Sequence, residues 1–210
     1  MWSTVPGCGP AKFGARAGVN IPLQDAEHYY LITEQIEGIS NTWPVIENPA
    51  SFGYYREEAG GLMIGLFEPE AALWKVEGVP EDFTFGEIPP DWDRMGPYVE
   101  RAMERVPISK EMGVRRLFCG AGELHPDLQP IAGEAPELKN CFVAAGLNSI
   151  GILIGGGLGR MLAHWIINDA PDVDVTGFNI DRIRSYQADP EYLRARTAES
   201  LGMVYRPNHQ

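Results

Sequence analysis

Alternation of side-chain character with a period of two predicts a strand near the start of this chain. The stretch Glu27–Thr33 is rich in aromatic and branched residues, which favour extended backbone. Successive side chains of a strand point to opposite faces, so the stretch has two faces of different composition. These faces are His28, Tyr30 and Ile32 on one side and Tyr29, Leu31 and Thr33 on the other.

Two further stretches, Phe52–Glu57 and Leu62–Phe67, predict a hairpin. They flank Glu58–Gly61, whose paired glycines are typical of a hairpin loop. The first strand also has two faces. They are Phe52, Tyr54 and Arg56 on one side and Tyr55 and Glu57 on the other.

Helical spacing of apolar residues predicts an amphipathic helix over Asp91–Arg105, with Asp91 as the N-cap. Its apolar positions are Trp92, Met95, Val99, Ala102 and Val106. Shorter helices are predicted at Ala11–Ala17 and Pro190–Ser200. The second lies in the polar segment Ser185–Gln210, which ends without a pattern that predicts packing and is interpreted as a linker or the start of another domain.

The stretch Phe142–Ala163 predicts a short buried strand, a tight turn at 146–148 and a helix that runs to about Asn168. Each glycine inside a helix costs about 1 kcal/mol relative to alanine, so propensity alone does not explain this composition. Three of the glycines are spaced by four and share one helical face, which allows a close approach. They are Gly151, Gly155 and Gly159.

Three interpretations of this glycine helix remain open at the level of pattern. Close packing of the helix on a sheet is the simplest. A membrane span is disfavoured because the glycines, Asn148 and Ser149 make a poor apolar run and Arg160 follows at once. A cofactor site is the third, although the stretch lacks the dinucleotide-binding spacing and a Walker lysine. Periodicity alone does not choose between packing and a cofactor.

Between the amphipathic helix and the glycine helix, Val114–Cys119 predicts a strand and Gly120–Pro136 a long loop. Long ordered loops in compact domains are usually functional. Within this loop we interpret His125 as a surface residue, and Asp127 and Glu134 as braces. Strands and hairpins come first, followed by a strand–turn–helix, and this order indicates an α+β fold with a mixed sheet.

Composition narrows the classes of function. The 210-residue chain is 44% hydrophobic with a formal net charge of −12, which suits one domain or two small lobes. Nucleic acids and anionic membranes attract clustered Lys and Arg, so the acidic balance argues against both. Three widely spaced cysteines (Cys8, Cys119 and Cys141) form no zinc or disulfide pattern, which favours a reducing compartment. No signal peptide is visible, so we expect a cytoplasmic protein, or a mitochondrial matrix protein in a eukaryote.

Five runs of residues carry a specific pattern when they are taken together and in order. They are Gly14–Leu23 (GARAGVNIPL), Glu27–Glu34 (EHYYLITE), Tyr54–Glu57 (YYRE), His125–Pro136 (HPDLQPIAGEAP) and Gly146–Gly151 (GLNSIG). Through this set, residues 14–205 resemble the FAD-dependent sarcosine and dimethylglycine dehydrogenase family, which are flavin oxidoreductases of the D-amino-acid-oxidase type.

The resemblance implies a split architecture. In that family the FAD-binding domain is interrupted by a substrate-binding lobe, and this chain is similar to the lobe and the returning part of the FAD domain only. The expected fold is therefore α+β, with a mixed or antiparallel substrate-lobe sheet, packed helices and the returning strand–turn–helix. The expected segments are 1–18 (linker remnant, with a link at Ser3–Phe13 longer than in the family), 19–120 (substrate lobe), 121–180 (FAD domain) and 181–210 (start of a following domain or linker).

The resemblance also implies a bound FAD, with its flavin at the turn before the glycine helix. Donors held at a helix N-terminus would stabilise the negative charge that builds on the flavin N1–C2=O edge during reduction. The expected cofactor-binding residues are Leu147, Asn148, Ser149 and Ile150 through their backbone N–H groups, and Gly146 and Gly151 through the close approach they allow.

Oxidation of an N-methyl amine by hydride transfer to flavin is the reaction implied. Two positions that the family uses at the substrate site match His28 and Tyr54. An imidazole titrating near neutrality, His28, could take up the proton of the amine, and the phenol of Tyr54 could hydrogen-bond to the substrate. From the residues alone, His28 is better interpreted as a core histidine than as a functional one. Arg56 shares the Tyr54 face and could bind a substrate carboxylate, although a solvated strand arginine is the simpler interpretation. No metal site is expected.

The expected partners are a small methylated amine, an N-terminal FAD-binding half that carries the site for the ADP part of FAD, and a downstream folate-binding domain. Without that N-terminal half we expect the chain to be inactive. The alternative is a non-catalytic role, because a relative on the same scaffold is a regulatory subunit of pyruvate dehydrogenase phosphatase. The pattern does not distinguish sarcosine from dimethylglycine.

Overall fold

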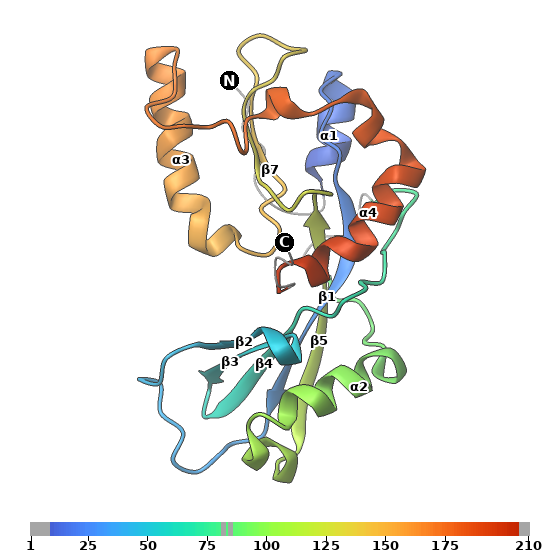
Figure 1. Ribbon diagram of the computed structural model, residues 1–210, viewed down its shortest axis with the longest axis vertical. Helices are drawn as coiled ribbons and strands as arrows, with labels where there is room; N and C mark the ends of the chain where they lie inside the picture. The colour runs from blue at the N-terminus through green and yellow to red at the C-terminus, as the bar shows by residue number, and fades with distance from the viewer. Residues whose placement is uncertain (1–8, 81–82, 84–85, 206–210) are drawn as a thin grey trace. The chain divides into compact units, whose positions relative to one another are not determined.

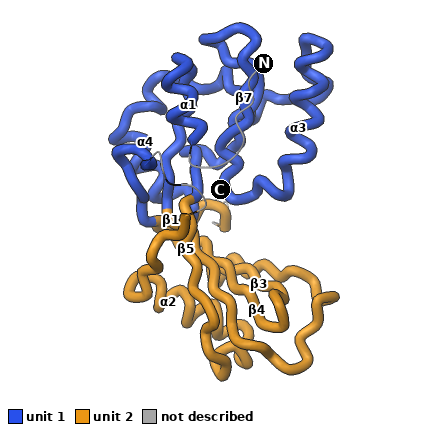
Figure 2. The backbone as a smooth tube through the Cα atoms, turned by 180° about the vertical axis from the view of Figure 1, so that it is seen from behind, with its two compact units in different colours: residues 1–26, 72–83, 122–201 blue, residues 27–71, 84–121, 202–210 orange. Residues whose placement is uncertain are grey.

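The computed structural model describes residues 9–80, 83 and 86–205. The predictions that concern Met1-Trp2 and Cys8 lie outside these residues. The chain divides into two compact units, which are described separately (Figure 2). Unit 1 comprises residues 1–26, 72–83 and 122–201, and unit 2 comprises residues 27–71, 84–121 and 202–210.

A five-stranded sheet with the order β2-β3-β4-β1-β5 forms the centre of unit 2 (Figure 1). Its strands are β1 (Gln24–Thr33), β2 (Ile46–Asn48), β3 (Gly53–Glu58), β4 (Gly61–Leu66) and β5 (Val114–Leu124). The first three residues of β1 and the last three of β5 belong to unit 1. The pairs β2–β3, β3–β4 and β1–β4 are antiparallel. The hairpin predicted around the paired glycines is confirmed as β3–β4.

Helix α2 (Trp92–Met103) covers one face of this sheet. Asp91 caps it as predicted, because its carboxylate accepts a hydrogen bond from the Arg94 N–H at 3.0 Å. The hydroxyl of Tyr55 donates to the Ala102 carbonyl at 3.0 Å, which joins β3 to the helix. The core contains the predicted face of β1 (Tyr29, Leu31 and Thr33) and three of the apolar positions predicted for α2 (Met95, Val99 and Ala102). Trp92, also predicted to pack on the sheet, is 47% exposed.

The centre of unit 1 is the two-stranded antiparallel sheet of β6 (Ile131–Glu134) and β7 (Phe142–Ala145). Helix α3 (Gly151–Asn168) lies on one side of β7 and helix α1 (Pro10–Ala17) on the other (Figure 1). Alternation along the two strands supplies both layers. One core contains Val19, Ile21, Leu23, Ile131, Val143, Ala145 and Ile180, and the other contains Ala132, Phe142, Met161 and Leu162.

The remaining helical segments are short, except for the last. They are the 3₁₀ helices Pro49–Ser51, Pro107–Glu111, Ile180–Arg182 and Ser185–Ala188, and helix α4 (Pro190–Met203). The sequence shows no packing pattern in the C-terminal segment, but the structure packs this segment. Thr197, Ser200 and Leu201 of α4 are buried, and Tyr205 is 9% exposed.

The loop predicted at Gly120–Pro136 is much shorter in the structure. Strand β5 continues to Leu124, and residues 131–134 form β6, so only residues 125–130 connect them. Two glycines, Gly120 and Gly122, interrupt the alternating pattern here and hide the strand.

The α+β class predicted from the sequence, with a mainly antiparallel sheet and packed helices, is confirmed. Among residues 9–80, 83 and 86–205, no helix has both the length and the apolar character needed to cross a bilayer.

Candidate functional site

The turn between β7 and α3 has an unusual backbone. Gly146, Asn148 and Ser149 have φ angles of +60°, +49° and +67°. This is the left-handed region, which glycine adopts readily and most other residues avoid. The Asn148 side chain holds the turn in this shape. Its oxygen accepts from the His125 N–H at 2.8 Å, and its amide nitrogen donates to the Gly146 carbonyl. Such strain often accompanies a ligand site.

The N–H groups of Leu147, Asn148 and Ser149 donate to no residue within the described part of the chain. The Ile150 N–H differs, because it donates to the Leu147 carbonyl at 3.0 Å. Three of the four donors expected at the flavin therefore remain available. A Cβ at Gly151 would come within 3.1 Å of the Leu147 side chain, so this glycine serves the turn itself.

The N-terminal half of α3 presents an uncovered surface. A Cβ placed on four glycines of this half, all after Gly151, would meet no atom within 4 Å among the described residues. These glycines are Gly155, Gly156, Gly157 and Gly159. Ile152 and Leu153 are largely exposed beside them. Helix α3 packs on the sheet from Leu158 onward, with Met161 and Leu162 in the core. Close packing within the described residues therefore does not explain the glycines.

A buried histidine that hydrogen-bonds to an aspartate supports the turn from the β5–β6 connection. His125 is fully buried, so its interpretation as a surface residue was wrong. Its Nδ1 bonds to the carboxylate of Asp127, which also accepts two 3.2 Å hydrogen bonds from Arg182. Burial acts to raise the pKa of Asp127, but the bonds from His125 and Arg182 prevail and hold it far below its usual range. Asp127 therefore braces this connection, as predicted.

Glu134 also braces its own turn. Its carboxylate accepts from the Asn140 N–H at 2.8 Å, which closes the connection between β6 and β7. The interpretation of Glu134 as a structural residue agrees with this contact.

His28 lies on β1, half-buried and with its Nδ1 shielded from solvent and without a hydrogen bond to any described residue. Burial lowers the pKa of His28 to about 4. The imidazole is therefore neutral at pH 7. Its pKa lies below the near-neutral range that the sequence led us to expect. In this state one ring nitrogen can accept a proton or a hydrogen bond.

Tyr54 and His28 belong to one aromatic cluster centred on Phe67. Ring centroids lie 5.0 Å apart for His28–Phe67 and 5.9 Å apart for Tyr54–Phe67. Tyr205, which follows α4, packs edge-on against Phe67 with 5.0 Å between the ring centroids. Tyr54 sits over Gly65, its partner across the β3–β4 ladder, where a Cβ would lie only 1.9 Å from the phenol ring. The structure thus brings together the two residues proposed from sequence for substrate chemistry and adds Tyr205.

Arg56 occupies an exposed position on β3. Its guanidinium pairs with Glu58 at 2.6 Å, and its Nε contacts the Met63 sulfur at 3.3 Å. An exposed ion pair of this kind contributes little to stability and is readily exchanged for another anion.

A buried charge network in unit 2 was not predicted. Glu68 is completely buried and accepts from Arg94 at 3.0 Å, and the same guanidinium donates to Glu27 at 3.0 Å. Glu27 also accepts from the Tyr29 hydroxyl. Burial raises the pKa of Glu68, although Arg94 opposes the shift. Only the three-dimensional structure brings residues 27, 68 and 94 together.

Metal chemistry finds no support in the described residues, where no group of three or more His, Cys, Asp or Glu side chains is placed to bind an ion. Cys119 and Cys141 are buried free thiols. The open amides and the uncovered glycine surface of unit 1 fit a flat, electron-rich ligand, and the His28–Tyr54 cluster belongs to unit 2.

Family profiles match nearly the whole chain. One, described as FAD dependent oxidoreductase, covers residues 5–165, and a second, FAD dependent oxidoreductase central domain, covers residues 168–210. The chain is 39% identical to mitochondrial sarcosine dehydrogenase of Homo sapiens over 91% of its own length, and 37% identical to 4-methylaminobutanoate oxidase (formaldehyde-forming) of Paenarthrobacter nicotinovorans over 91%. It spans only 21% and 23% of those proteins.

Two further similarities bear on function and fold. The mitochondrial pyruvate dehydrogenase phosphatase regulatory subunit of Mus musculus is 29% identical over 89% of this chain and 21% of that protein. The crystal structure of L-proline dehydrogenase from P. horikoshii superposes with a TM-score of 0.65 at 20% identity, covering 93% of this chain and 47% of that one. The second similarity supports the fold alone.

Proposed function

Because this chain belongs to the FAD dependent oxidoreductase family, we propose that it is part of an enzyme that oxidises a small N-methylated amine by hydride transfer to flavin. FAD, when bound, supplies the hydride acceptor. Candidate substrates are sarcosine, dimethylglycine and 4-methylaminobutanoate, all of which appear in the names of relatives.

The turn before α3 is the observation that carries this proposal. Left-handed backbone at Gly146, Asn148 and Ser149 leaves the N–H groups of residues 147–149 without acceptors among the described residues. Amides fixed in this way can stabilise negative charge on the flavin without reorganising. The uncovered glycines of α3 leave room for a flat group beside the turn.

His28 and Tyr54 have suitable protonation states for a substrate amine. The neutral imidazole of His28 can accept the proton that a methylated ammonium must lose before hydride transfer. Burial raises the pKa of Tyr54, so its hydroxyl stays protonated and can donate to the substrate. Arg56 is our candidate for a substrate carboxylate, since its exposed pair with Glu58 can be exchanged.

We propose that the working protein also contains a second polypeptide segment, which holds the ADP part of FAD and covers the glycine surface of α3. A downstream folate-binding domain is the other proposed partner. By itself the chain is expected to be catalytically inactive. The mitochondrial relatives suggest the matrix as the location if the source is eukaryotic.

A chimera tests the function. In it, this chain replaces the matching segment of human sarcosine dehydrogenase, which supplies the remaining four-fifths of that protein. We expect the purified chimera to show the visible absorbance bands of bound flavin, and anaerobic addition of a methylated amine to bleach them. The chain alone should show no flavin bands. A chimera that contains no flavin would remove the cofactor assignment.

The similarity to the phosphatase regulatory subunit supports a second candidate, a non-catalytic interaction protein on the same scaffold. The same experiment separates the two. Full flavin content without bleaching by sarcosine, dimethylglycine or 4-methylaminobutanoate would favour the regulatory role over the enzymatic one.

Replacing Gly146 by valine should reduce the flavin content of the chimera at least about tenfold, because backbone strain and a clash each cost more than about 1 kcal/mol. Gly146 has a φ of +60°, and a Cβ there would lie 2.7 Å from the Leu23 side chain. Flavin absorbance per mole of protein is the measurement. Gly177→Val is the matched control, because a Cβ at Gly177 meets no atom within 4 Å. Equal flavin content in both variants would contradict the assignment of the turn.

A further inference from the structure

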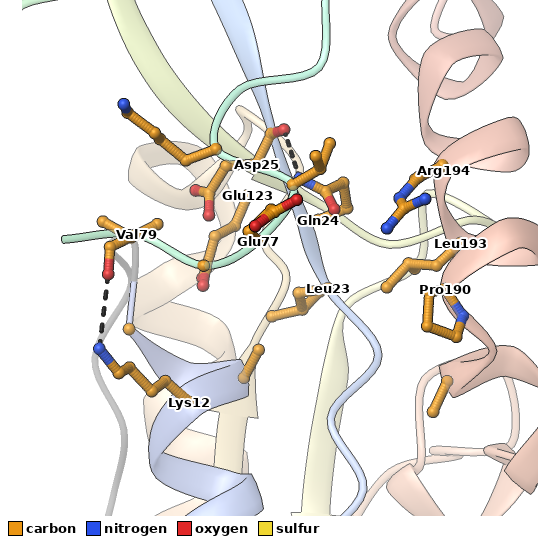
Figure 3. Close-up of a pocket in the computed structure, with 16 residues that line it drawn as sticks. Lys12, Leu23, Gln24, Asp25, Glu77, Val79, Glu123, Pro190, Leu193 and Arg194 are labelled. Carbon is orange, nitrogen blue, oxygen red and sulfur yellow. Dashed lines mark hydrogen bonds between the residues drawn. The ribbon is translucent and has the colours of Figure 1, made fainter.

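A cavity of about 430 Å³ lies within unit 1, away from the glycine turn in sequence and with a different chemistry. Helix α1, the start of β1, residues 75–79, the end of β5 and the first turns of α4 line it (Figure 3). Its charged lining residues are Lys12, Asp25, Lys75, Glu77, Glu123 and Arg194. A volume in this range suits a small metabolite rather than a macromolecule.

Three carboxylates form one side of the cavity. Figure 3 shows Asp25, Glu77 and Glu123 converging from three separate segments. Asp25 is only 8% exposed. Burial, and then the negative charge of Asp25, raise the pKa of Glu123 to about 9, against the hydrogen bond from the Gly9 amide. At pH 7 Glu123 is therefore protonated beside the negative charge of Asp25.

A guanidinium faces these carboxylates. Arg194 extends from α4 toward the carboxylate side (Figure 3) and forms no hydrogen bond or ion pair with any residue that the structure describes. Asp189 caps α4 by accepting from the N–H groups of Glu191 and Tyr192, both at 3.0 Å, and so fixes the helix turn that carries Arg194. Leu193 adds an apolar wall beside the guanidinium.

The segment that closes the cavity is attached to β1 by two hydrogen bonds through Trp74. The Gln24 side chain donates to the Trp74 carbonyl at 3.1 Å, and the Trp74 N–H donates to the Asp25 carbonyl at 2.9 Å. Lys12 donates to the Val79 carbonyl at 3.4 Å from α1. The cavity walls are therefore defined by contacts within unit 1 and do not depend on a ligand.

We propose that this cavity binds a small zwitterionic amino acid, with its ammonium group between Asp25 and Glu123 and its carboxylate group directed to Arg194. A zwitterion places opposite charges against the Asp25–Glu123 side and against Arg194 at the same time, which neither a simple anion nor a simple cation does. Leu23, Val76 and Leu193 supply apolar contact for a short methylene chain. This proposal does not rest on flavin binding or on the oxidation reaction.

Binding should be linked to the release of a proton. An ammonium group close to Glu123 favours the ionised carboxylate, so the pKa of Glu123 falls on binding. Because the free cavity holds this proton up to a pKa of about 9, affinity should rise as the pH increases from neutrality toward that value. The other charged groups that face the cavity are Asp25, Glu77, Lys12, Lys75 and Arg194.

The test is calorimetry on the purified 210-residue chain without flavin, with 4-aminobutanoate as the probe. Butylamine and butanoate are the matched probes that lack one charge each. We expect 4-aminobutanoate to bind about tenfold or more tightly than either, as expected for one additional charge-assisted pair. Titration in two buffers of different ionisation enthalpy should show release of up to about one proton per ligand near neutrality.

Two variants and a control locate the site. Glu123→Gln should abolish proton release, and Arg194→Gln should weaken 4-aminobutanoate about tenfold while leaving butylamine unchanged. Arg196→Gln, on the same helix but outside the cavity lining, should change neither. Circular dichroism confirms that each variant is folded. The proposal is overturned if ω-amino acids from glycine to 6-aminohexanoate fail to bind at millimolar concentrations, if butylamine binds equally well, or if both variants bind as the original chain does.

Discussion

Replacing Arg94 by methionine is expected to lower the free energy of unfolding by about 3–5 kcal/mol at pH 7, the usual cost of leaving a buried charge without its partner. Glu68 has no exposed surface, and its carboxylate is paired with Arg94 at 3.0 Å. Methionine fills a similar volume but cannot donate hydrogen bonds. Chemical denaturation of the purified chain, followed by circular dichroism, measures the loss.

The pH dependence of this loss identifies its cause. Burial already raises the pKa of Glu68 above its usual value, and removal of Arg94 takes away the bond and the charge that oppose this shift. A carboxyl group whose pKa is higher in the folded state favours folding while it is protonated, and this benefit disappears as the pH rises through the folded pKa. The deficit should therefore be smaller at about pH 5 than at about pH 8.

The double variant Arg94→Met with Glu68→Gln is the control for the buried charge. A neutral amide does not ionise, so the double variant should recover much of the stability lost at about pH 8. A deficit that is the same at both pH values, and is not relieved by Glu68→Gln, would show that lost packing of Arg94 dominates instead.

Replacing Gly65 by alanine should destabilise unit 2 by about 1–3 kcal/mol and displace Tyr54, because overpacking forces neighbours off their preferred positions. A Cβ on Gly65 would lie 1.9 Å from the Tyr54 ring, much closer than any contact between carbons. Tyr54 would have to rotate away from its position beside Phe67. Thermal unfolding measures the stability, and bleaching of flavin in the chimera measures the consequence for the substrate site.

A double-mutant cycle ties this effect to the ring. In a Tyr54→Ala background, Gly65→Ala should cost little, because the clashing atoms are absent. Gly96→Ala in α2 is the matched control, since its Cβ would meet no atom within 4 Å, and better helix propensity should stabilise it by up to about 1 kcal/mol. An equal cost of Gly65→Ala with and without the Tyr54 ring would contradict the explanation.

Local patterns predicted the elements whose side chains alternate or repeat without interruption. The period of two in Glu27–Thr33 identified β1 and its buried face, and the apolar spacing after Asp91 identified α2 and its cap. The pattern failed where glycines replace informative side chains, in the second half of β5. It also failed at β6, which has only four residues and lies between two prolines.

Of the candidate site, the sequence predicted the turn, whose shape is determined by local backbone conformation. Glycine content and order in the Gly146–Gly151 run indicated the turn, and the structure gives it left-handed backbone. The Ile150 N–H donates to the Leu147 carbonyl within the turn, and this bond depends on backbone geometry that the sequence pattern does not reveal. The burial of His125 depends on tertiary packing, and its Asp127 partner is held by Arg182, 55 residues away in sequence. Tertiary contacts of this kind leave no periodic signal in one sequence.

The uncovered half of α3 affects the fate of the chain in a cell. Ile152 and Leu153 face water where a stably folded protein would cover them, and neighbouring glycines weaken the helix that carries them. Quality-control chaperones and proteases recognise such surfaces. If the proposed second segment covers this half of α3, it should therefore protect the chain from degradation.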